Sequence, residues 1–175
     1  MPHAFRTASL AALALALSSA MALAVASGSH EGGHDEARIG EAGQSARVSR
    51  TINVDMVDAM RFTPSSISVK QGETIRFVVK NSGQVKHELV LGTGQQLKEH
   101  YALMLKNPEM EHADANQITV APGKTGDVIW RFTQPGKVDF ACLQPGHLDA
   151  GMKGLVNVVP VAQPGAADGH TTHKH

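Results

Sequence analysis

One segment near the C-terminus carries three side chains that bind soft metal ions. Cys142, His147 and Met152 lie in a Gly/Pro-rich stretch that reads CLQPGHLDAGM. Blue-copper sites combine one cysteine and two histidines in a plane with a distant axial methionine. The second histidine must come from elsewhere, and His87 opens a strand-like run that can supply it. These four residues are therefore the candidate copper ligands.

Each ligand has its own task in such a site. The Cys142 thiolate makes the strongest bond and sets the colour and redox character, while His87 and His147 complete the plane. Met152 lies axially and favours Cu(I). Taken singly, the cysteine reads as a buried hydrophobe, His147 as a turn residue and Met152 as core. Their combination on one loop favours copper.

The N-terminal segment predicts export from the cytoplasm. Residues 1–26 contain an Ala/Leu-rich run that ends in a small-x-small site at Ala24–Ala26, which is typical of a cleaved signal peptide. An uncleaved membrane anchor is the alternative. We expect the mature protein to be periplasmic, with a disordered His-containing leader over residues 27–47, a folded domain over 48–160 and a disordered His-containing tail over 161–175.

Charge and cysteine content narrow the function. The formal net charge is +0, which gives no basic footprint for nucleic acid. The single cysteine cannot form an internal disulfide, so in an oxidising compartment it is buried and inert, reactive, or protected by a metal. The residues around Cys142 favour the metal.

The middle of the chain reads as short strands separated by Gly/Pro turns. Apolar residues alternate at period two in several runs, for example over 52–56, 75–79, 128–132 and 138–142. Many short strands of this kind predict an all-β Greek-key sandwich or barrel. Residues 95–106 break the pattern, because Leu97, Tyr101, Met104 and Leu105 recur at helical spacing. We expect one short helical insertion there.

These motifs together resemble the cupredoxins, the type 1 blue or green copper proteins. The run from Met60 to Gly72, followed by Ile75-Arg-Phe77 and Asn81, is similar to the N-terminal half of that family. His87 matches its first copper ligand, and Cys142, His147 and Met152 match its ligand loop. The resemblance covers residues 50–160 and implies a cupredoxin fold with one type 1 copper per chain.

Two departures distinguish this chain within the family. The Cys-x4-His-x4-Met spacing differs from the shorter Cys–His gap of plastocyanin and the shorter His–Met gap of azurin. Glu88 stands where several cupredoxins carry an asparagine that links the ligand loops. The long insert before Ile118 and the His-bearing ends are most similar to the periplasmic copper-tolerance cupredoxins of the CopI type.

Other histidines and methionines are candidates for weaker metal sites. His-rich ends suit additional Cu(II) or Zn(II), with a solvated tail as the alternative. Met104, Met110 and His112 are candidates for a Cu(I) docking patch, although methionines more often fill core gaps. The terminal histidines concerned are His30, His34, His170, His173 and His175.

Two functions share this one site. The first is copper binding that contributes to copper tolerance, and the second is one-electron transfer, with Leu143, Pro145 and Leu148 as a docking surface near His147. An enzyme is disfavoured, because Ala141 and Leu143 flank Cys142 where multicopper oxidases carry histidines. We expect a monomer that binds copper and a redox or copper-transfer partner protein, with no membrane attachment after signal cleavage.

Overall fold

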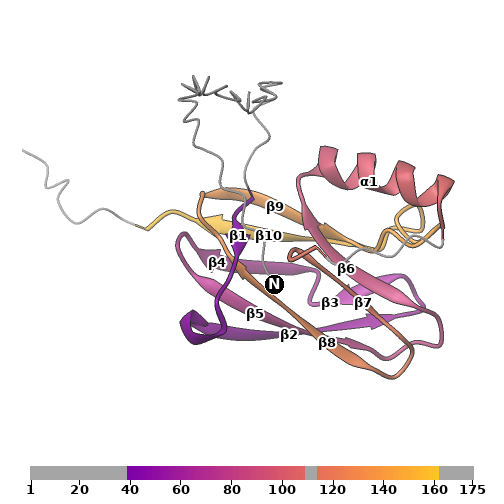
Figure 1. Ribbon diagram of the computed structural model, residues 1–175, viewed down its shortest axis with the longest axis horizontal. Coiled ribbons are helices and arrows are strands. Elements are labelled where there is room, and N and C mark those ends of the chain that lie inside the picture. The colour runs from indigo at the N-terminus through magenta and orange to yellow at the C-terminus, as the bar shows by residue number, and fades with distance from the viewer. Residues whose placement is uncertain (1–38, 109–113, 162–175) are drawn as a thin grey trace, which may run out of the picture. The chain divides into compact units, whose positions relative to one another are not determined.

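Two five-stranded sheets form the folded part of the chain. The computed structural model describes residues 39–108 and 114–161. One sheet has the order β1-β8-β5-β2-β3, and the other has the order β4-β10-β9-β6-β7 (Figure 1). The strands are β1 Glu41–Ala42, β2 Arg50–Val57, β3 Arg61–Thr63, β4 Ser66–Lys70, β5 Thr74–Asn81, β6 His87–Gly92, β7 Gln117–Val120, β8 Thr125–Arg131, β9 Gly136–Ala141 and β10 Lys153–Val159.

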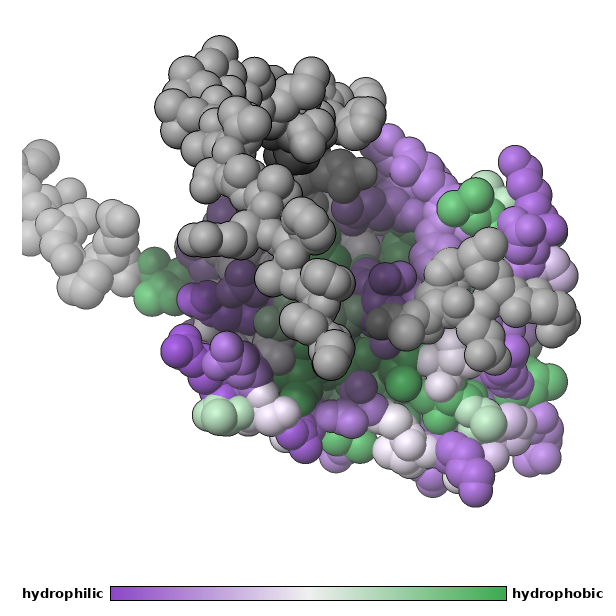
Figure 2. Space-filling model, in the orientation of Figure 1, coloured by the Kyte–Doolittle hydropathy of each residue, from purple (hydrophilic) through white to green (hydrophobic). Residues whose placement is uncertain are grey.

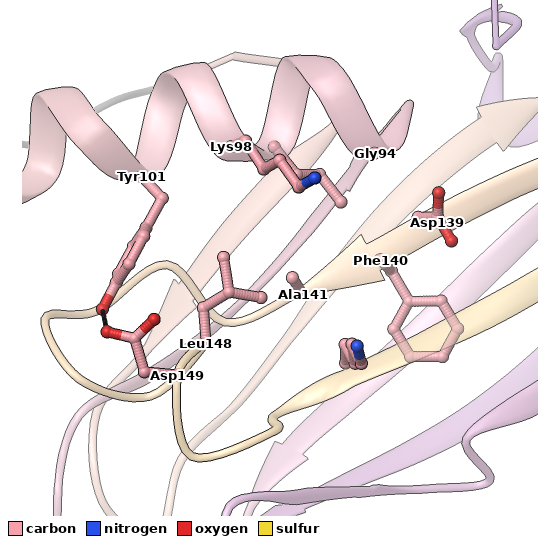
Figure 3. Close-up of a pocket in the computed structure, with 10 residues that line it drawn as sticks. Gly94, Lys98, Tyr101, Asp139, Phe140, Ala141, Leu148 and Asp149 are labelled. Atoms are coloured by element: carbon pink, nitrogen blue, oxygen red, sulfur yellow. Dashed lines mark hydrogen bonds between the residues drawn. The ribbon is translucent and has the colours of Figure 1, made fainter.

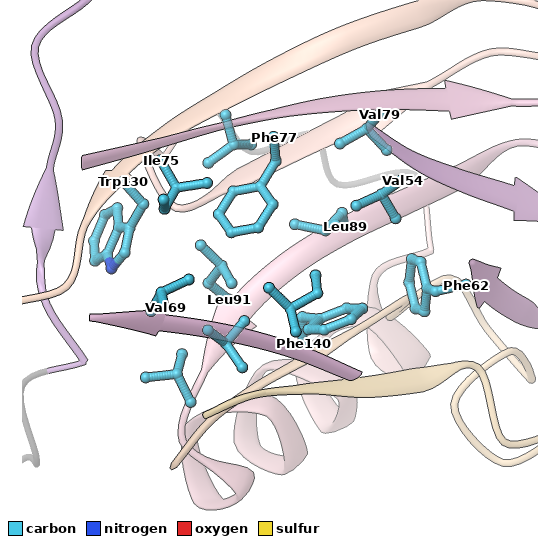
Figure 4. Packing of buried hydrophobic residues seen from close by; sticks show 14 of the residues in the cluster. Val54, Phe62, Val69, Ile75, Phe77, Val79, Leu89, Leu91, Trp130 and Phe140 are labelled. Carbon is cyan, nitrogen blue, oxygen red and sulfur yellow. The ribbon is translucent and has the colours of Figure 1, made fainter. Parts of the chain in front are cut away.

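The alternation in the sequence produces the core between the sheets. In β5, Ile75, Phe77 and Val79 are buried, because every second side chain of a strand faces the same side. Phe62 and Phe140 meet edge to face across this core, with ring centroids 5.0 Å apart (Figure 4). The predicted all-β Greek-key sandwich is confirmed.

Strand β6 is buried along its whole length, and its two faces contact different clusters. Leu89 and Leu91 pack into the core between the sheets. Val90 points the other way and belongs to a second cluster with Ala141 and Leu143. Because side chains alternate along a strand, His87 shares a face with Leu89, and Glu88 shares a face with Val90. His87 and Glu88 therefore lie on opposite faces of β6, the first on the side of the core between the sheets and the second on the side of the second cluster.

A single helix is present in the described residues, α1 at Gly94–Lys106, between β6 and β7. Thr93 and Gln96 form a capping box at its start, which satisfies backbone N–H groups that have no partner within the helix. Leu97, Tyr101 and Met104 face the second cluster, and the outer face of α1 is largely hydrophilic (Figure 2). The predicted helix is confirmed, but Leu105 is 52% exposed and does not join the buried stripe.

Two strands were not predicted. Strand β3 pairs with β2, and β1 pairs with β8. Residues 41–47, which were expected in a disordered leader, instead form β1 and a 3-10 turn at Ser45–Arg47. The sequence does not reveal β1, because this strand is held by backbone pairing with β8, which requires no apolar pattern. Residues 27–38 of the predicted leader, the signal segment and residues 162–175 of the predicted tail lie outside the described residues. Within the described ranges, no helix has the length and hydrophobicity needed to span a membrane.

Candidate metal centre

Three of the predicted ligands meet at one end of the sandwich. His87 is the first residue of β6, and Cys142 follows directly after β9 on the face that Phe140 also occupies. The Nδ1 atoms of His87 and His147 are 3.2 Å apart. The Cys142 Sγ lies 3.2 Å from His147 Nδ1 and 3.9 Å from His87 Nδ1. Residues 60 positions apart in the sequence therefore present their donor atoms to one point.

The spacing of these atoms fits a single metal ion. Imidazole nitrogen and thiolate sulfur bind a borderline metal at about 2.0–2.3 Å, so three such donors in a plane lie roughly 3.5–3.8 Å apart. The observed separations of 3.2 to 3.9 Å bracket that value. His87 and Cys142 are fully buried, and His147 is half-buried. The donor set suits copper, because two imidazoles and one thiolate form the plane of a type 1 site.

Met152 closes the loop that carries the other ligands. Its side chain is fully buried and packs in the same core cluster as Cys142. Its N–H donates to the carbonyl of His147 at 3.0 Å, and its own carbonyl accepts from the Cys142 N–H at 3.1 Å. The thioether therefore belongs to a short, internally hydrogen-bonded loop in which all three loop ligands are near neighbours.

Asp58 orients the ring of His87 from outside the metal site. Its Oδ1 lies 3.0 Å from His87 Nε2, so a proton on Nε2 leaves Nδ1 free to bind a metal. The N–H groups of Gln84 and Val85 also donate to this carboxylate. The hydrogen bond from Gln84 is the main cause that lowers the pKa of Asp58. Gly83 leaves space for the Asp58 side chain, because a Cβ at position 83 would collide with the carboxylate.

Glu88 links β6 to the ligand loop. Its Oε1 accepts from the Leu143 N–H at 2.9 Å, and its Oε2 accepts from Gln144 Nε2 at 3.2 Å. The Thr119 hydroxyl donates to the same carboxylate. The Glu88 N–H points to Cys142 Sγ at 3.4 Å. Glu88 thus links the segments that asparagine links in several cupredoxins, although its side chain is longer and acidic.

Two more side chains contact the loop from other elements. The Tyr101 hydroxyl accepts from the Gly146 N–H at 2.9 Å and donates to Asp149 Oδ2 at 2.7 Å. Arg61 donates to the Ala150 carbonyl at 3.1 Å. None of these three contacts was predicted from the sequence, because the partners are 45, 48 and 89 positions apart and no local spacing connects them.

Burial changes the ionisation of the metal donors. It is the main cause that raises the pKa of the Cys142 thiol to about 12, since a thiolate loses its hydration there. Burial also lowers the pKa of His147, and the neighbouring His87 adds to this effect. The imidazole of His147 is therefore neutral at pH 7, and a metal ion must displace the thiol proton.

A pocket lies beside the loop, between α1 and β9. It has a volume of about 440 Å³. Leu97, Ala141 and Leu148 give it an apolar lining, and Lys98, Asp139, Asp149 and Lys153 also line it (Figure 3). The pocket shares Tyr101 and Asp149 with the contact between the helix and the loop, and it contains none of the candidate ligands.

The structure corrects or leaves open several accessory predictions. Met104 packs in the second cluster, so it is a core residue and not part of an exposed docking patch. Met110, His112 and the terminal histidines lie outside the described residues. Leu143 is fully buried and cannot contribute to a docking surface, because its side chain faces α1. Of the other two residues, Pro145 is exposed and Leu148 is half-buried.

Comparisons with known proteins agree with this geometry. A family profile described as copper binding proteins of the plastocyanin/azurin family matches residues 48–159. The copper-resistant cuproprotein CopI of Rubrivivax gelatinosus is 46% identical over 132 residues, which are 74% of this chain and 80% of that protein. The protein of the same name from Pseudomonas aeruginosa is 36% identical and is matched over 73% of this chain and 85% of its own length.

The solved structures add evidence for the fold. A structure of auracyanin B superimposes with a TM-score of 0.59 at 24% identity and covers 69% of this chain and 96% of that chain. The chain therefore belongs to the copper-binding proteins of the plastocyanin/azurin family, as a cupredoxin of the CopI type with one type 1 copper.

Proposed function

We propose that this protein binds copper through His87, Cys142, His147 and Met152 in the periplasm and contributes to copper tolerance. The observation that carries the ligand assignment is the convergence of two Nδ1 atoms and one Sγ, all within 4.8 Å of one another. Bound copper would supply a site that cycles between Cu(I) and Cu(II). The protein's own part is to hold the donors in one geometry for both oxidation states.

The scaffold supports that part. His87 and Cys142 extend from neighbouring strands, since β6 and β9 pair with each other. The hydrogen bonds made by Asp58, Glu88 and Tyr101 restrict His87 and the ligand loop from three sides. A site whose donors are already in place needs little rearrangement to take up copper or to change its oxidation state.

The tolerance role rests on the relatives. Two proteins named copper-resistant cuproprotein CopI match more than two thirds of this chain. The signal-like residues 1–26 support a periplasmic location, and the apolar residues that flank Cys142 support binding without catalysis. N-terminal sequencing of the protein from the periplasmic fraction tests export and signal cleavage together. An intact Met1 would contradict the cleavage.

A copper titration tests the ligand assignment. Addition of Cu(II) to the mature protein should give an intense visible band that saturates at one copper per chain, and Cys142→Ser should abolish it. Copper uptake beyond that point, lost when the terminal histidines are removed, would support secondary sites at the chain ends. If the wild-type protein gives no thiolate band, the assignment is wrong.

Growth at elevated copper tests the role. A deletion strain should become copper-sensitive, and the wild-type gene should restore growth while the Cys142→Ser gene should not. Unchanged copper sensitivity of the deletion strain would contradict the tolerance role and leave the copper site itself intact.

One-electron transfer is the second candidate. His147 is half-buried, whereas His87 and Cys142 are fully buried, so His147 alone of these three ligands reaches the surface. The exposed Pro145 lies two positions before it in the sequence. Stopped-flow electron exchange with small redox reagents tests this role: fast transfer that Pro145→Glu slows would support it, and slow transfer in both would count against it.

A further inference from the structure

The helical insertion contacts the ligand loop through both apolar packing and hydrogen bonds. Leu97, Tyr101 and Met104 of α1 share a buried cluster with Leu143, and Leu148 packs against it. This cluster lies on the outer side of β6 and β9, away from the core between the sheets. The helix is therefore packed against the segment that carries the copper ligands.

The contacts of the Tyr101 hydroxyl lie on both sides of His147. It accepts from the Gly146 N–H, one position before the ligand, and donates to Asp149, two positions after it. A hydroxyl has one proton to donate and lone pairs to accept, so this pairing uses both capacities. Tyr101 is only 7% exposed, so its ring is held in place by the second cluster while its hydroxyl reaches the loop.

The other loop contacts lie closer to the two ends of the loop. Glu88 holds Leu143 and Gln144 near its start, and Arg61 donates to Ala150 near its end. Gly146 has a φ of +85°, a backbone conformation that favours glycine and sets the direction in which the chain leaves towards His147. The hydrogen bond from its N–H fixes the peptide plane between Pro145 and Gly146.

We propose that Tyr101 is a positioning residue of the copper centre, through which α1 holds His147 in its metal-binding place. This inference rests on copper binding by the loop and is independent of the tolerance role. The hydroxyl touches neither the metal nor a ligand side chain. Its effect is to restrict the loop backbone on both sides of His147 before copper arrives and after it leaves.

Tyr101→Phe tests this inference, because it keeps the ring in the cluster and removes only the hydroxyl. In the copper-free protein, amide hydrogen exchange at Gly146 should become about 2- to 10-fold faster, which is the range expected for the loss of one ordinary hydrogen bond. In the copper-loaded protein, release to a chelator should accelerate by a similar factor. The visible and electron-paramagnetic-resonance spectra should also shift.

A graded series separates positioning from general destabilisation. Asp149→Asn keeps an acceptor for the hydroxyl and should behave like the wild type, while Asp149→Ala should give part of the Tyr101→Phe effect. Val69→Ala is the matched control, because it opens a cavity at the buried Val69, which pairs with Val158 near the far end of β10. It should lower stability without a change in the spectra or at Gly146.

The outcomes distinguish this inference from the copper assignment. If Tyr101→Phe shows the same spectra, exchange rate and copper release as the wild type, Tyr101 has no positioning role, while the copper site stands. If Val69→Ala reproduces every effect of Tyr101→Phe, those effects report only stability, and the inference is wrong. If the wild-type protein shows no thiolate band, the copper assignment fails first.

Discussion

The Glu88 carboxylate accepts a hydrogen bond from the Leu143 N–H at 2.9 Å. This bond joins the residue that follows His87 to the residue that follows Cys142. Both residues are buried, with Glu88 5% exposed. Strand β6, which carries His87, and the loop that carries Cys142 therefore cannot separate without breaking this buried hydrogen bond. The second carboxylate oxygen of Glu88 accepts from Gln144 Nε2 and from the Thr119 hydroxyl, so both oxygens of the side chain are used.

Replacement of Glu88 should destabilise the copper-free protein in a graded way. Glu88→Ala leaves the Leu143 N–H buried without its partner, at a cost of about 1–3 kcal/mol in the free energy of unfolding. Glu88→Gln retains an acceptor oxygen, so its cost should be smaller. Urea denaturation followed by the fluorescence of Trp130, the one tryptophan of the chain, measures both. An equal loss of unfolding free energy in the two variants would show that the acceptor oxygen of residue 88 does not stabilise the fold.

Loss of the Asp58 contact should weaken copper binding. Asp58→Ala removes the partner of His87 Nε2, and partners of this kind typically contribute about 10- to 100-fold to metal affinity. Gly83→Ala should act in the same direction, because the added Cβ displaces the carboxylate. Competition with a chelator of known affinity measures both effects.

Gly94→Ala is the control for the glycine substitution. Its added Cβ would meet Asp139 at 3.4 Å, an ordinary contact, so copper affinity should stay unchanged. Asp58→Asn keeps an acceptor near His87 and should fall between the wild type and Asp58→Ala. An affinity that is the same in all four variants and the wild type would rule out a role of Asp58 in orienting His87.

Tyr101 should ionise only at a pH above its ordinary value. Burial is the main cause that raises its pKa above 10.0, and the Asp149 contact adds to this. Because the folded state holds the proton more tightly than the unfolded state, this stabilisation is complete below pH 10 and is lost as the pH rises through the folded pKa. Tyr101 is the one tyrosine of the chain, so phenolate absorbance reports it directly. A midpoint at or below the ordinary value in the folded protein would contradict this prediction.

Phe140 should be among the most costly core positions to truncate. Its ring contacts Phe62 and lies so close to Gly154 that no Cβ would fit there. Phe140→Ala should lower the free energy of unfolding by about 3–5 kcal/mol, because it removes buried area and leaves a cavity. Phe140→Leu, which fills most of the space, should cost less. Thermal unfolding of the copper-free protein measures both variants. A smaller loss of stability in Phe140→Ala than in Phe140→Leu would contradict the prediction.

The elements and the donor set could be predicted from the sequence because each leaves a local pattern. The period-two runs gave most strands of the sandwich, and the helical spacing of Leu97, Tyr101 and Met104 gave α1. His87, Cys142 and His147 were recognised by their chemistry, and the structure brings their donor atoms together. Cys142 continues the period-two run of Val138 and Phe140, and all three side chains pack in the core between the sheets.

The residues that support the ligands could not be predicted in the same way. Asp58 and Tyr101 contact residues 29 and 48 positions away in the sequence, and no local pattern points to those partners. Leu143 was misassigned to the surface, because its position in a polar loop gives no sign that a helix covers it. Such contacts depend on how distant elements pack, which local spacing does not encode.

The place of α1 in the chain has a consequence for how this fold can diversify. The helix is inserted between β6 and β7, and these strands still pair residue by residue from His87 with Val120 to Val90 with Gln117. The connection can therefore lengthen or shorten over evolution without a shift in the register of β6 against β7. Proteins with identical copper ligands can then differ in how quickly they exchange their metal, according to the helix that each carries in this connection.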